Sequence, residues 1–428
     1  MALTQEIYRA YTAILKEEML VAMGCTEPIA ISYAAAIVRE ALGKLPTRVR
    51  AGLSGNIIKN VKSVVVPATG GMHGIGTAIV AGLVAGNPDK RLEVLTILTE
   101  QDVPSIKALS ESLELEIYEL ETEHPFEVLI EGYADGKSAS AHLAQRHTNV
   151  VKVTRNDEDL TARYKTEEAY TVSETHDRSL LNVKDIIEFA ESVELDELAP
   201  LLSRQIEMNT AIAEEGIQND WGASIGKVLY NNGQCNTRTK ARAYAAAGSD
   251  ARMSGCELPV SIISGSGNQG ITASVPIAIY AERWEKSREE MLRALIVSNL
   301  ITIHQKTGIG CLSAYCGAIS AGCGCGCGIA FLAGGRYHEI AHTLVNSVAI
   351  LSGTICDGAK PSCAAKIAMA GDAGIMGYEM YCEGCEFFGG EGLVSKGVEN
   401  TIRNIYALGH DGMKETDKKI IEIMTGRC

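Results

Sequence analysis

The chain has 428 residues, beyond the length at which a single hydrophobic core stops growing, so two domains are the first expectation. The formal net charge of -14 argues against nucleic acid or an anionic membrane surface as the main partner. The amphipathic start lacks the basic stretch and the uninterrupted apolar run of a signal peptide, and a cytoplasmic protein is therefore expected.

The first part of the chain predicts two helices, over residues 4–22 and 29–42. Between them lies the segment Gly24-Cys25-Thr26-Glu27-Pro28. Pro28 suits the first turn of a helix, because its missing N–H is not needed there. Cys25 is therefore expected at a helix N-terminus, where the helix dipole favours a thiolate. The alternative is a capping turn with a buried thiol.

Residues 48 to about 170 predict an α/β-type domain. Helical stretches at 76–85 and 103–112 alternate with short β-rich runs at 48–55, 91–98, 113–120, 126–133 and 149–155. The segment Ala134-Asp135-Gly136-Lys137 predicts a tight hairpin turn.

After Leu181 the chain is predicted to be mainly helical. One short strand, over residues 258–264, ends in Gly265-Ser266-Gly267-Asn268-Gln269-Gly270, and a helix begins directly after it. Free backbone N–H groups at such a helix start suit an anion. The whole pattern predicts a mixed α+β fold, with an α/β-type mixed-sheet domain over 46–174 and a large helical domain formed by 1–45 and 175–428.

The thirteen cysteines, an odd number in a protein expected to be cytoplasmic, indicate reduced thiols or metal ligands before disulfides. Cys356 and Cys363 flank a turn with Gly and Pro, which bends two thiols towards one point, and Cys316 comes from a different helix. Thiolates are soft ligands that suit iron–sulfur clusters. The alternative from spacing alone is that these are small buried residues.

Other cysteines are better explained by close packing. On a helix, Cys323 and Cys327 share a face while Cys325 points away, so the three do not readily ligate one ion. Burial is also the preferred interpretation for Cys235 and Cys256.

Five short segments together point to a known family. They are Gly24-Cys25-Thr26-Glu27-Pro28, Ser54-Gly55-Asn56 with Lys59-Asn60, Ser266-Gly267-Asn268-Gln269-Gly270, Cys316-Gly317-Ala318 and Ile355-Cys356-Asp357-Gly358-Ala359-Lys360. On these motifs the chain resembles the L-cysteine desulfidase family, which is related to the iron–sulfur L-serine dehydratases. The likeness covers nearly the full length.

The resemblance implies that Cys316, Cys356 and Cys363 hold a [4Fe-4S] cluster and leave one iron open. The interval between the last two cysteines is shorter than in the serine dehydratases, as in the desulfidase branch. Some serine dehydratases of this kind carry a terminal cysteine that folds back onto the open iron, so Cys428 is a further candidate ligand.

An open iron acts as a Lewis acid on the β-substituent of an amino acid, and a base removes the α-proton. The resemblance implies that Cys25 is this catalytic base, and Glu27 is the rival candidate. Gly-rich turns with hydroxyl and amide donors suit the substrate carboxylate. The residues expected to bind the substrate are Ser54, Asn56, Lys59, Ser266, Asn268 and Gln269.

The predicted function is that of an iron–sulfur L-cysteine desulfidase, a carbon–sulfur lyase of cysteine catabolism that forms hydrogen sulfide, ammonia and pyruvate. Its partner is a small amino-acid substrate, with no nucleic acid and no membrane, and a homo-oligomer is compatible with the sequence. One alternative is an L-serine dehydratase of the same mechanism, a carbon–oxygen lyase. The other is a non-enzymatic redox or metal-sensing protein.

Overall fold

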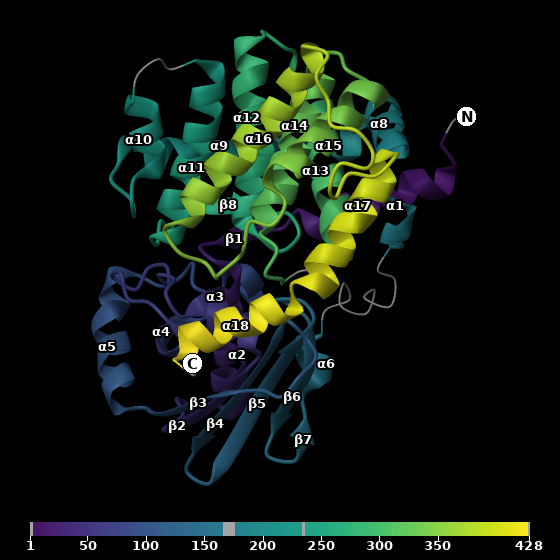
Figure 1. The fold of residues 1–428 in the computed structure, drawn as a ribbon. Coiled ribbons are helices and arrows are strands. Elements are labelled where there is room, and N and C mark those ends of the chain that lie inside the picture. Colours follow the sequence, from purple (N-terminus) through teal and green to yellow (C-terminus); the bar gives the residue numbers. More distant parts are fainter. Residues whose placement is uncertain (1–2, 166–175, 233–235, 311, 427–428) are drawn as a thin grey trace.

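A computed structural model describes residues 3–165, 176–232, 236–310 and 312–426. The molecule has a half built around a β-sheet and a half built of packed helices (Figure 1). The mixed α+β prediction is confirmed. The C-terminal helix α18 (Lys414–Thr425) leaves the helical half and packs on α3 (Gly55–Val61) of the sheet half.

The described part of the sheet half contains a six-stranded sheet of order β3-β2-β4-β5-β6-β7. Strands β2 and β3 are parallel and the other neighbours are antiparallel. The predicted hairpin turn joins β4 to β5, with positive φ at Asp135 (49°) and Gly136 (73°), as a two-residue turn requires. The strands are β2 (Arg48–Leu53), β3 (Glu114–Glu119), β4 (Glu127–Ala134), β5 (Lys137–Ala144), β6 (Val150–Arg155) and β7 (Glu158–Asp159).

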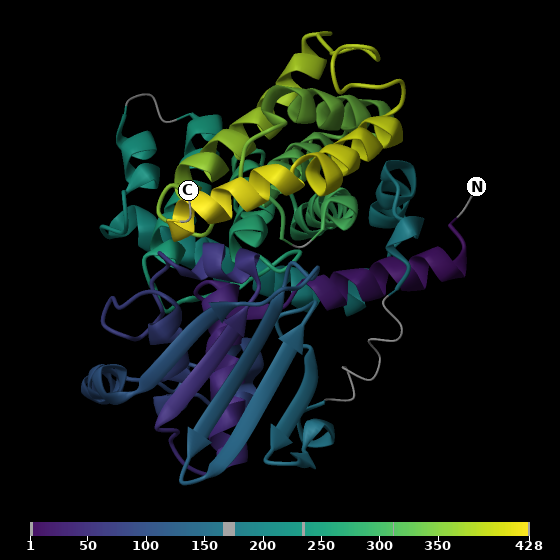
Figure 2. The ribbon, with the colours of Figure 1, turned by 60° about the horizontal axis from the view of Figure 1, so that its bottom comes forward.

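Helix α2 (Thr26–Leu42) covers one face of the sheet, where it packs against β4 and β5 (Figure 2). Burial alternates along β4, because successive side chains point to opposite faces. Helix α4 (Ile75–Ala85) packs on α2, and the other α-helices among the described residues of this half are α5 (Val103–Ser112) and α6 (Thr161–Tyr164). Although α2 falls within the residues grouped above with the helical domain, it packs on the sheet; the domain division itself stays a prediction.

Residues 91–98 were predicted as a strand, and this is wrong. They continue a 3-10 turn, η1 (Pro88–Glu93), into further turns in which Val94, Thr96 and Leu98 each donate to the carbonyl three residues earlier. The Asn87 side chain accepts from the N–H of Asp89 and starts the first turn. The apolar residues of the run are buried all the same, and a short apolar run does not reveal by its periodicity whether it is a strand or a buried turn.

The helical half confirms the predicted helical character of the chain after residue 181. Among the described residues, no helix combines the length and apolar character needed to cross a membrane. Its helices are α1 (Gln5–Glu18), α8 (Val183–Ser192), α9 (Ala199–Gln218), α10 (Ile225–Asn231), α11 (Thr237–Met253), α12 (Gly267–Arg283), α13 (Arg288–Ile309), α14 (Gly317–Leu332), α15 (Tyr337–Leu351), α16 (Cys363–Cys382) and α17 (Val398–Ala407).

Two short strands join the start of the chain to its middle. The predicted helix over 4–22 ends at Glu18, and β1 (Val21–Met23) follows. It pairs antiparallel with β8 (Pro259–Ser261) of the helical half, with Val21 opposite Ser261. The segment that leads to α2 is therefore held beside the segment that leads to α12.

Helices α14 and α16 approach each other closely through glycines. A Cβ on Gly322 would lie 2.2 Å from the carbonyl oxygen of Ala370, and a Cβ on Gly326 would lie 2.3 Å from that of Gly374. Both partners advance by four residues in the same direction, so the two helices run parallel. The same register carried back to their first turns places Cys316 beside Cys363.

The close contact between α14 and α16 predicts that a Gly→Ala substitution lowers the free energy of unfolding only at positions where the two helices touch. Gly374→Ala places a Cβ 2.1 Å from the oxygen of Gly322, and we expect a loss of about 1–3 kcal/mol in the free energy of unfolding, measured by urea denaturation. Gly371→Ala on the same helix is the control, because no atom lies within 4 Å of its added Cβ. It should be neutral or stabilising through helix propensity. Equal losses in both variants would contradict the close contact.

Candidate functional site

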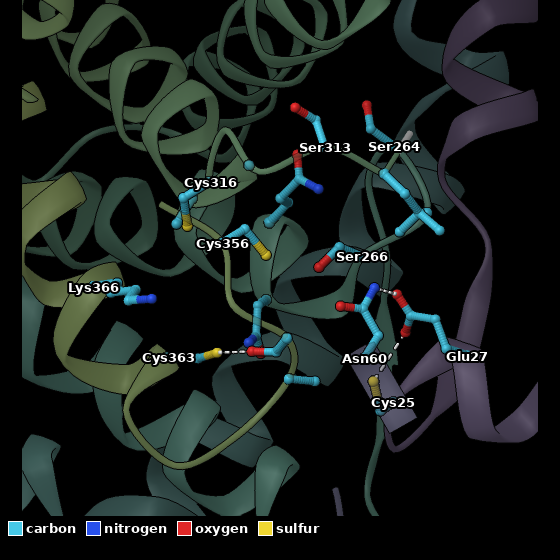
Figure 3. Close-up of a pocket in the computed structure, with 18 of the residues that line it drawn as sticks. Cys25, Glu27, Asn60, Ser264, Ser266, Ser313, Cys316, Cys356, Cys363 and Lys366 are labelled. Atoms are coloured by element: carbon cyan, nitrogen blue, oxygen red, sulfur yellow. Dashed lines mark hydrogen bonds between the residues drawn. The ribbon is translucent and has the colours of Figure 1, made fainter. Parts of the chain in front are cut away.

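A small cavity of about 110 Å³ lies where the two halves of the molecule meet. A cavity of this size admits small groups and excludes a macromolecular ligand. Cys316, Cys356 and Cys363 lie on one side of it, and Cys25 and Glu27 lie on the other (Figure 3). The structure thus brings together the predicted base and all three predicted cluster ligands.

A pair of backbone hydrogen bonds fixes Cys316 and Cys356 next to each other. The N–H of Cys316 donates to the carbonyl oxygen of Thr354 (3.0 Å), and the N–H of Cys356 donates to that of Ala314 (2.6 Å). Between them, Tyr315 and Ile355 form an isolated antiparallel bridge. Two segments forty residues apart in the chain are therefore joined through the backbones of the two cysteines.

Burial and mutual proximity both act on these thiols. Burial, and after it the neighbouring Cys356 and Cys363, raise the pKa of Cys316 to about 12. Lys366 lines the same wall and donates to the carbonyl oxygen of Ile355 (2.9 Å) and to Oδ1 of Asp357 (2.5 Å). Its positive charge favours the thiolates that a metal ligand set requires.

The described residues contain no group of three or more His, Cys, Asp or Glu side chains arranged to hold a single metal ion. The thiols that line the cavity fit an iron–sulfur cluster instead, because each thiolate of a cluster ligates a different iron and the thiols need not meet at one atom. Cys323, Cys325 and Cys327 are buried inside α14 and do not line the cavity. Cys235, Cys311 and Cys428 lie outside the described residues.

Cys25 forms a pair with Glu27. It is the N-cap residue of α2, is 2% exposed, and its Sγ lies 3.0 Å from Oε2 of Glu27. Burial, and after it the Glu27 carboxylate, raise the pKa of the Cys25 thiol well above its usual range. The expectation of a thiolate favoured by the helix dipole is therefore wrong, because burial and a neighbouring anion outweigh the dipole.

Glu27 is the charged member of the pair. Burial alone would raise its pKa, but His147, the Cys25 thiol and other donors outweigh burial, and the net pKa is lowered. Its Oε2 accepts from the Thr26 hydroxyl (3.1 Å) and its Oε1 from the Asn60 amide (3.2 Å). Thr26 also donates to the carbonyl oxygen of Gly265 (2.8 Å), which ties the pair to the loop before α12.

Four of the six residues predicted to bind the substrate line this cavity: Lys59, Ser266, Asn268 and Gln269. The buried Lys59 donates to Oδ1 of Asp417 on α18 (2.5 Å). Gln269 packs against Gly317, where a Cβ would lie 2.8 Å from its Cδ. The start of α12 is therefore in direct contact with the start of α14.

Ser54 and Asn56 do not line the cavity. The Ser54 hydroxyl donates to the carbonyl oxygen of Pro125 (2.8 Å) and accepts from the N–H of Glu127 (3.3 Å), which anchors the start of α3 to β4. The same short helix sends Lys59 and Asn60 into the cavity instead.

The cavity also has basic residues that the sequence motifs do not single out, Arg252 and His147 among them. Burial outweighs the opposing effect of the neighbouring Glu27 carboxylate and lowers the pKa of His147. Arg252 lies near the end of α11, within a run of buried Ala, Gly and Ser residues. The sequence motifs missed Arg252, and a charged residue within a run of small residues is the signal that could have found it.

Residues 89–422 match the model of the serine dehydratase alpha chain family. The chain belongs to this family. The serine dehydratase family is linked to iron–sulfur chemistry, so the predicted relation to iron–sulfur serine dehydratase-type lyases is confirmed, whereas the preferred substrate is not decided by membership.

Relatives extend over the whole chain. A UPF0597 protein of Desulfitobacterium hafniense is 52% identical over 421 residues, which cover 98% of this chain and 97% of the relative. A UPF0597 protein of Treponema denticola is 42% identical over 429 residues, which cover 99% of both chains. A UPF0597 protein of Lachnoclostridium phytofermentans is 43% identical over 418 residues, which cover 98% of this chain and 100% of the relative.

The contact between Cys25 and Glu27 predicts that the pH at which Cys25 reacts depends on the charge of Glu27. Removal of the Glu27 charge by Glu27→Gln should lower the pKa of Cys25, because that charge raises it in the native protein. Alkylation of Cys25 by iodoacetamide, followed by peptide mass spectrometry, should then begin at a lower pH. Glu40→Gln, at the other end of α2, is the control. Alkylation that begins at the same or a higher pH in Glu27→Gln would contradict this assignment.

Proposed function

We propose that this protein is an L-cysteine desulfidase that uses a [4Fe-4S] cluster held by Cys316, Cys356 and Cys363. The observation that carries the proposal is the composition of the cavity, where three thiols face a thiol–carboxylate pair across a space for a small solute (Figure 3). Membership of the serine dehydratase alpha chain family supports the reaction class.

A cluster bound through three protein thiolates supplies an open iron, a Lewis acid for the β-substituent of an amino acid. The chain provides the surroundings for such a negatively charged group. Cys316 is the N-cap residue of α14 and Cys363 opens α16, so two helix N-termini point at the thiols. Lys366 brings a positive charge to the same wall, partly offset by the Asp357 carboxylate with which it pairs.

The Cys25–Glu27 pair acts as the base. In the resting state the thiol of Cys25 carries its proton and Glu27 is ionised. Sγ of Cys25 accepts the α-proton of the substrate as its own proton passes to Oε2 of Glu27 over the 3.0 Å hydrogen bond. The Cβ–S bond then breaks, which gives aminoacrylate and hydrosulfide, and water converts aminoacrylate to pyruvate and ammonium.

L-Cysteine is the proposed substrate because of the short loop between Cys356 and Cys363, a feature shared with the desulfidase branch. In this chain Asp357 stabilises the loop, because its Oδ1 forms ion pairs with Nζ of Lys360 and with Nζ of Lys366, at 2.5 Å each. Gly358 rests on α3, where a Cβ would lie 2.4 Å from the carbonyl oxygen of Lys59. L-Serine dehydration is the second candidate, and the name of the matched family favours it.

The cluster assignment predicts which cysteines matter for iron. Cys316→Ala, Cys356→Ala and Cys363→Ala should each lower the iron and acid-labile sulfide bound after anaerobic reconstitution, together with the visible absorbance. Cys323→Ala is the matched control, because Cys323 lies on α14 but does not line the cavity. A full iron content in all three cavity variants, or an equal loss in the control, would refute the ligand set.

Substrate choice is tested on the same reconstituted protein. We expect kcat/KM for sulfide release from L-cysteine to exceed kcat/KM for pyruvate formation from L-serine by at least about tenfold, a difference of about 1.4 kcal/mol in transition-state stabilisation. The reverse order would identify a serine dehydratase. If neither amino acid is turned over while the cluster is present, the lyase proposal fails.

A further inference from the structure

The cavity wall contains a buried guanidinium that the steps above do not use. Arg252 is 2% exposed and lines the cavity from the end of α11. Its Nη1 donates to Oδ1 of Asn268 (3.1 Å). Nε and Nη2 are buried and have no hydrogen-bond acceptor within the part of the chain that the structure describes.

The two unpartnered nitrogens form one edge of the guanidinium. Nε–H and Nη2–H lie side by side on that edge and match the two oxygens of a carboxylate. Asn268 binds the remaining nitrogen, Nη1, and so holds the plane of the group. The free edge is therefore fixed in orientation before a ligand arrives.

The start of α12 leaves room for this side chain. A Cβ on Gly267 would lie 2.4 Å from Nε and 2.8 Å from Cζ of Arg252, so only glycine lets the guanidinium rest against this backbone. The neighbouring Asn268 and Gln269 belong to the turn that was expected to bind the substrate carboxylate. The turn at the start of α12 therefore positions the guanidinium of Arg252.

Acceptors without a partner line the same cavity. Oε1 of Gln269 and Oδ1 of Asn60 are buried and unpartnered within the described residues. Buried polar groups in native proteins are nearly all paired, so a cluster of unpaired donors and acceptors in one cavity indicates a ligand that pairs them. An α-amino acid supplies both kinds of partner, since its carboxylate accepts and its ammonium donates.

We propose that Arg252 binds the α-carboxylate of the substrate through Nε and Nη2, and this rests on the amino-acid lyase function proposed above. Two other cations of the cavity have carboxylate partners, since Lys59 pairs with Asp417 and Lys366 pairs with Asp357. The cavity of about 110 Å³ and the neighbouring Glu27 carboxylate disfavour larger or more highly charged anions.

The test compares two ligands that cannot undergo β-elimination. L-Alanine keeps the carboxylate, and L-alaninamide replaces it by a neutral amide. Calorimetry on the anaerobically reconstituted protein should show that the native protein prefers L-alanine. Arg252→Gln should weaken L-alanine binding roughly 10- to 100-fold, the range for hydrogen bonds to a charged group, and leave L-alaninamide binding within about twofold.

Arg242→Gln is the matched control, because Arg242 lies on the same helix, pairs with Asp372 (3.2 Å) and does not line the cavity. It should bind both ligands as the native protein does. Arg252→Lys keeps the charge but loses the paired donors, and its loss of L-alanine affinity should be intermediate. If circular dichroism shows that Arg252→Gln does not fold, Arg252→Lys and Gly267→Ala carry the comparison, and both should weaken L-alanine selectively.

Failure of this proposal is distinct from failure of the lyase function. Equal affinity of the native protein for the two ligands, no binding of L-alanine, or an unchanged preference in the Arg252 variants would overturn the carboxylate assignment, even with L-cysteine turned over. Conversely, selective and Arg252-dependent binding of L-alanine without turnover of L-cysteine or L-serine would keep the carboxylate site and remove the lyase function.

Discussion

The close parallel contact between α14 and α16 is the constraint on which the site depends. Gly322 and Gly326 of α14 lie so close to Ala370 and Gly374 of α16 that a side chain on either Gly322 or Gly326 would overlap the backbone of α16. Because these helices start at the cavity, their register decides where the thiols of Cys316 and Cys363 lie. The Gly- and Cys-rich run of α14 therefore has a packing role: it positions the cysteines proposed as cluster ligands, and its own cysteines do not line the cavity.

A second consequence is the convergence of helix N-termini. Within the described chain, α2, α12, α14 and α16 all begin at the cavity, at Cys25, Ser266, Cys316 and Ser362, and none of these N-cap residues makes a side-chain cap hydrogen bond. The partial positive charge of each helix start is thus left to act on the cavity. The pairing of β1 with β8 brings the first two starts together, and the bridge between Tyr315 and Ile355 brings the thiol segments together. An anionic cluster and a carboxylate are both stabilised by such a field.

The sequence predicted the fold class and most helices and strands, because these have local signatures, whereas the cysteines that meet at the cavity were selected by the family resemblance and not by their spacing. Periodicity identified α2, β4 and α5, and the Asp-Gly turn identified the hairpin. The run at 91–98 misled because its apolar residues are buried in turns, where periodicity is uninformative. The raised pKa of Cys25 depends on burial and on the ionised Glu27, and the carboxylate-binding role proposed for Arg252 depends on a contact with Asn268 made through the fold. Such effects arise from contacts between distant parts of the chain, and the spacing of residues along the sequence does not predict them.

Several polar groups of the cavity make no hydrogen bond within the described chain and are left for a ligand to pair. Two nitrogens of Arg252 and single oxygens of Gln269 and Asn60 are in this state among the described residues. A buried polar atom that neither protein nor solvent pairs costs about 1–3 kcal/mol. Replacement of these side chains by apolar ones would remove any such cost, yet the fold makes room for the guanidinium by a glycine at 267 and orients it by Asn268. Because the fold holds these unpaired polar groups in fixed positions, the protein needs less reorganisation when a ligand binds. The same reasoning applies to Cys25, whose proton is already placed on the line to Glu27 before any substrate binds.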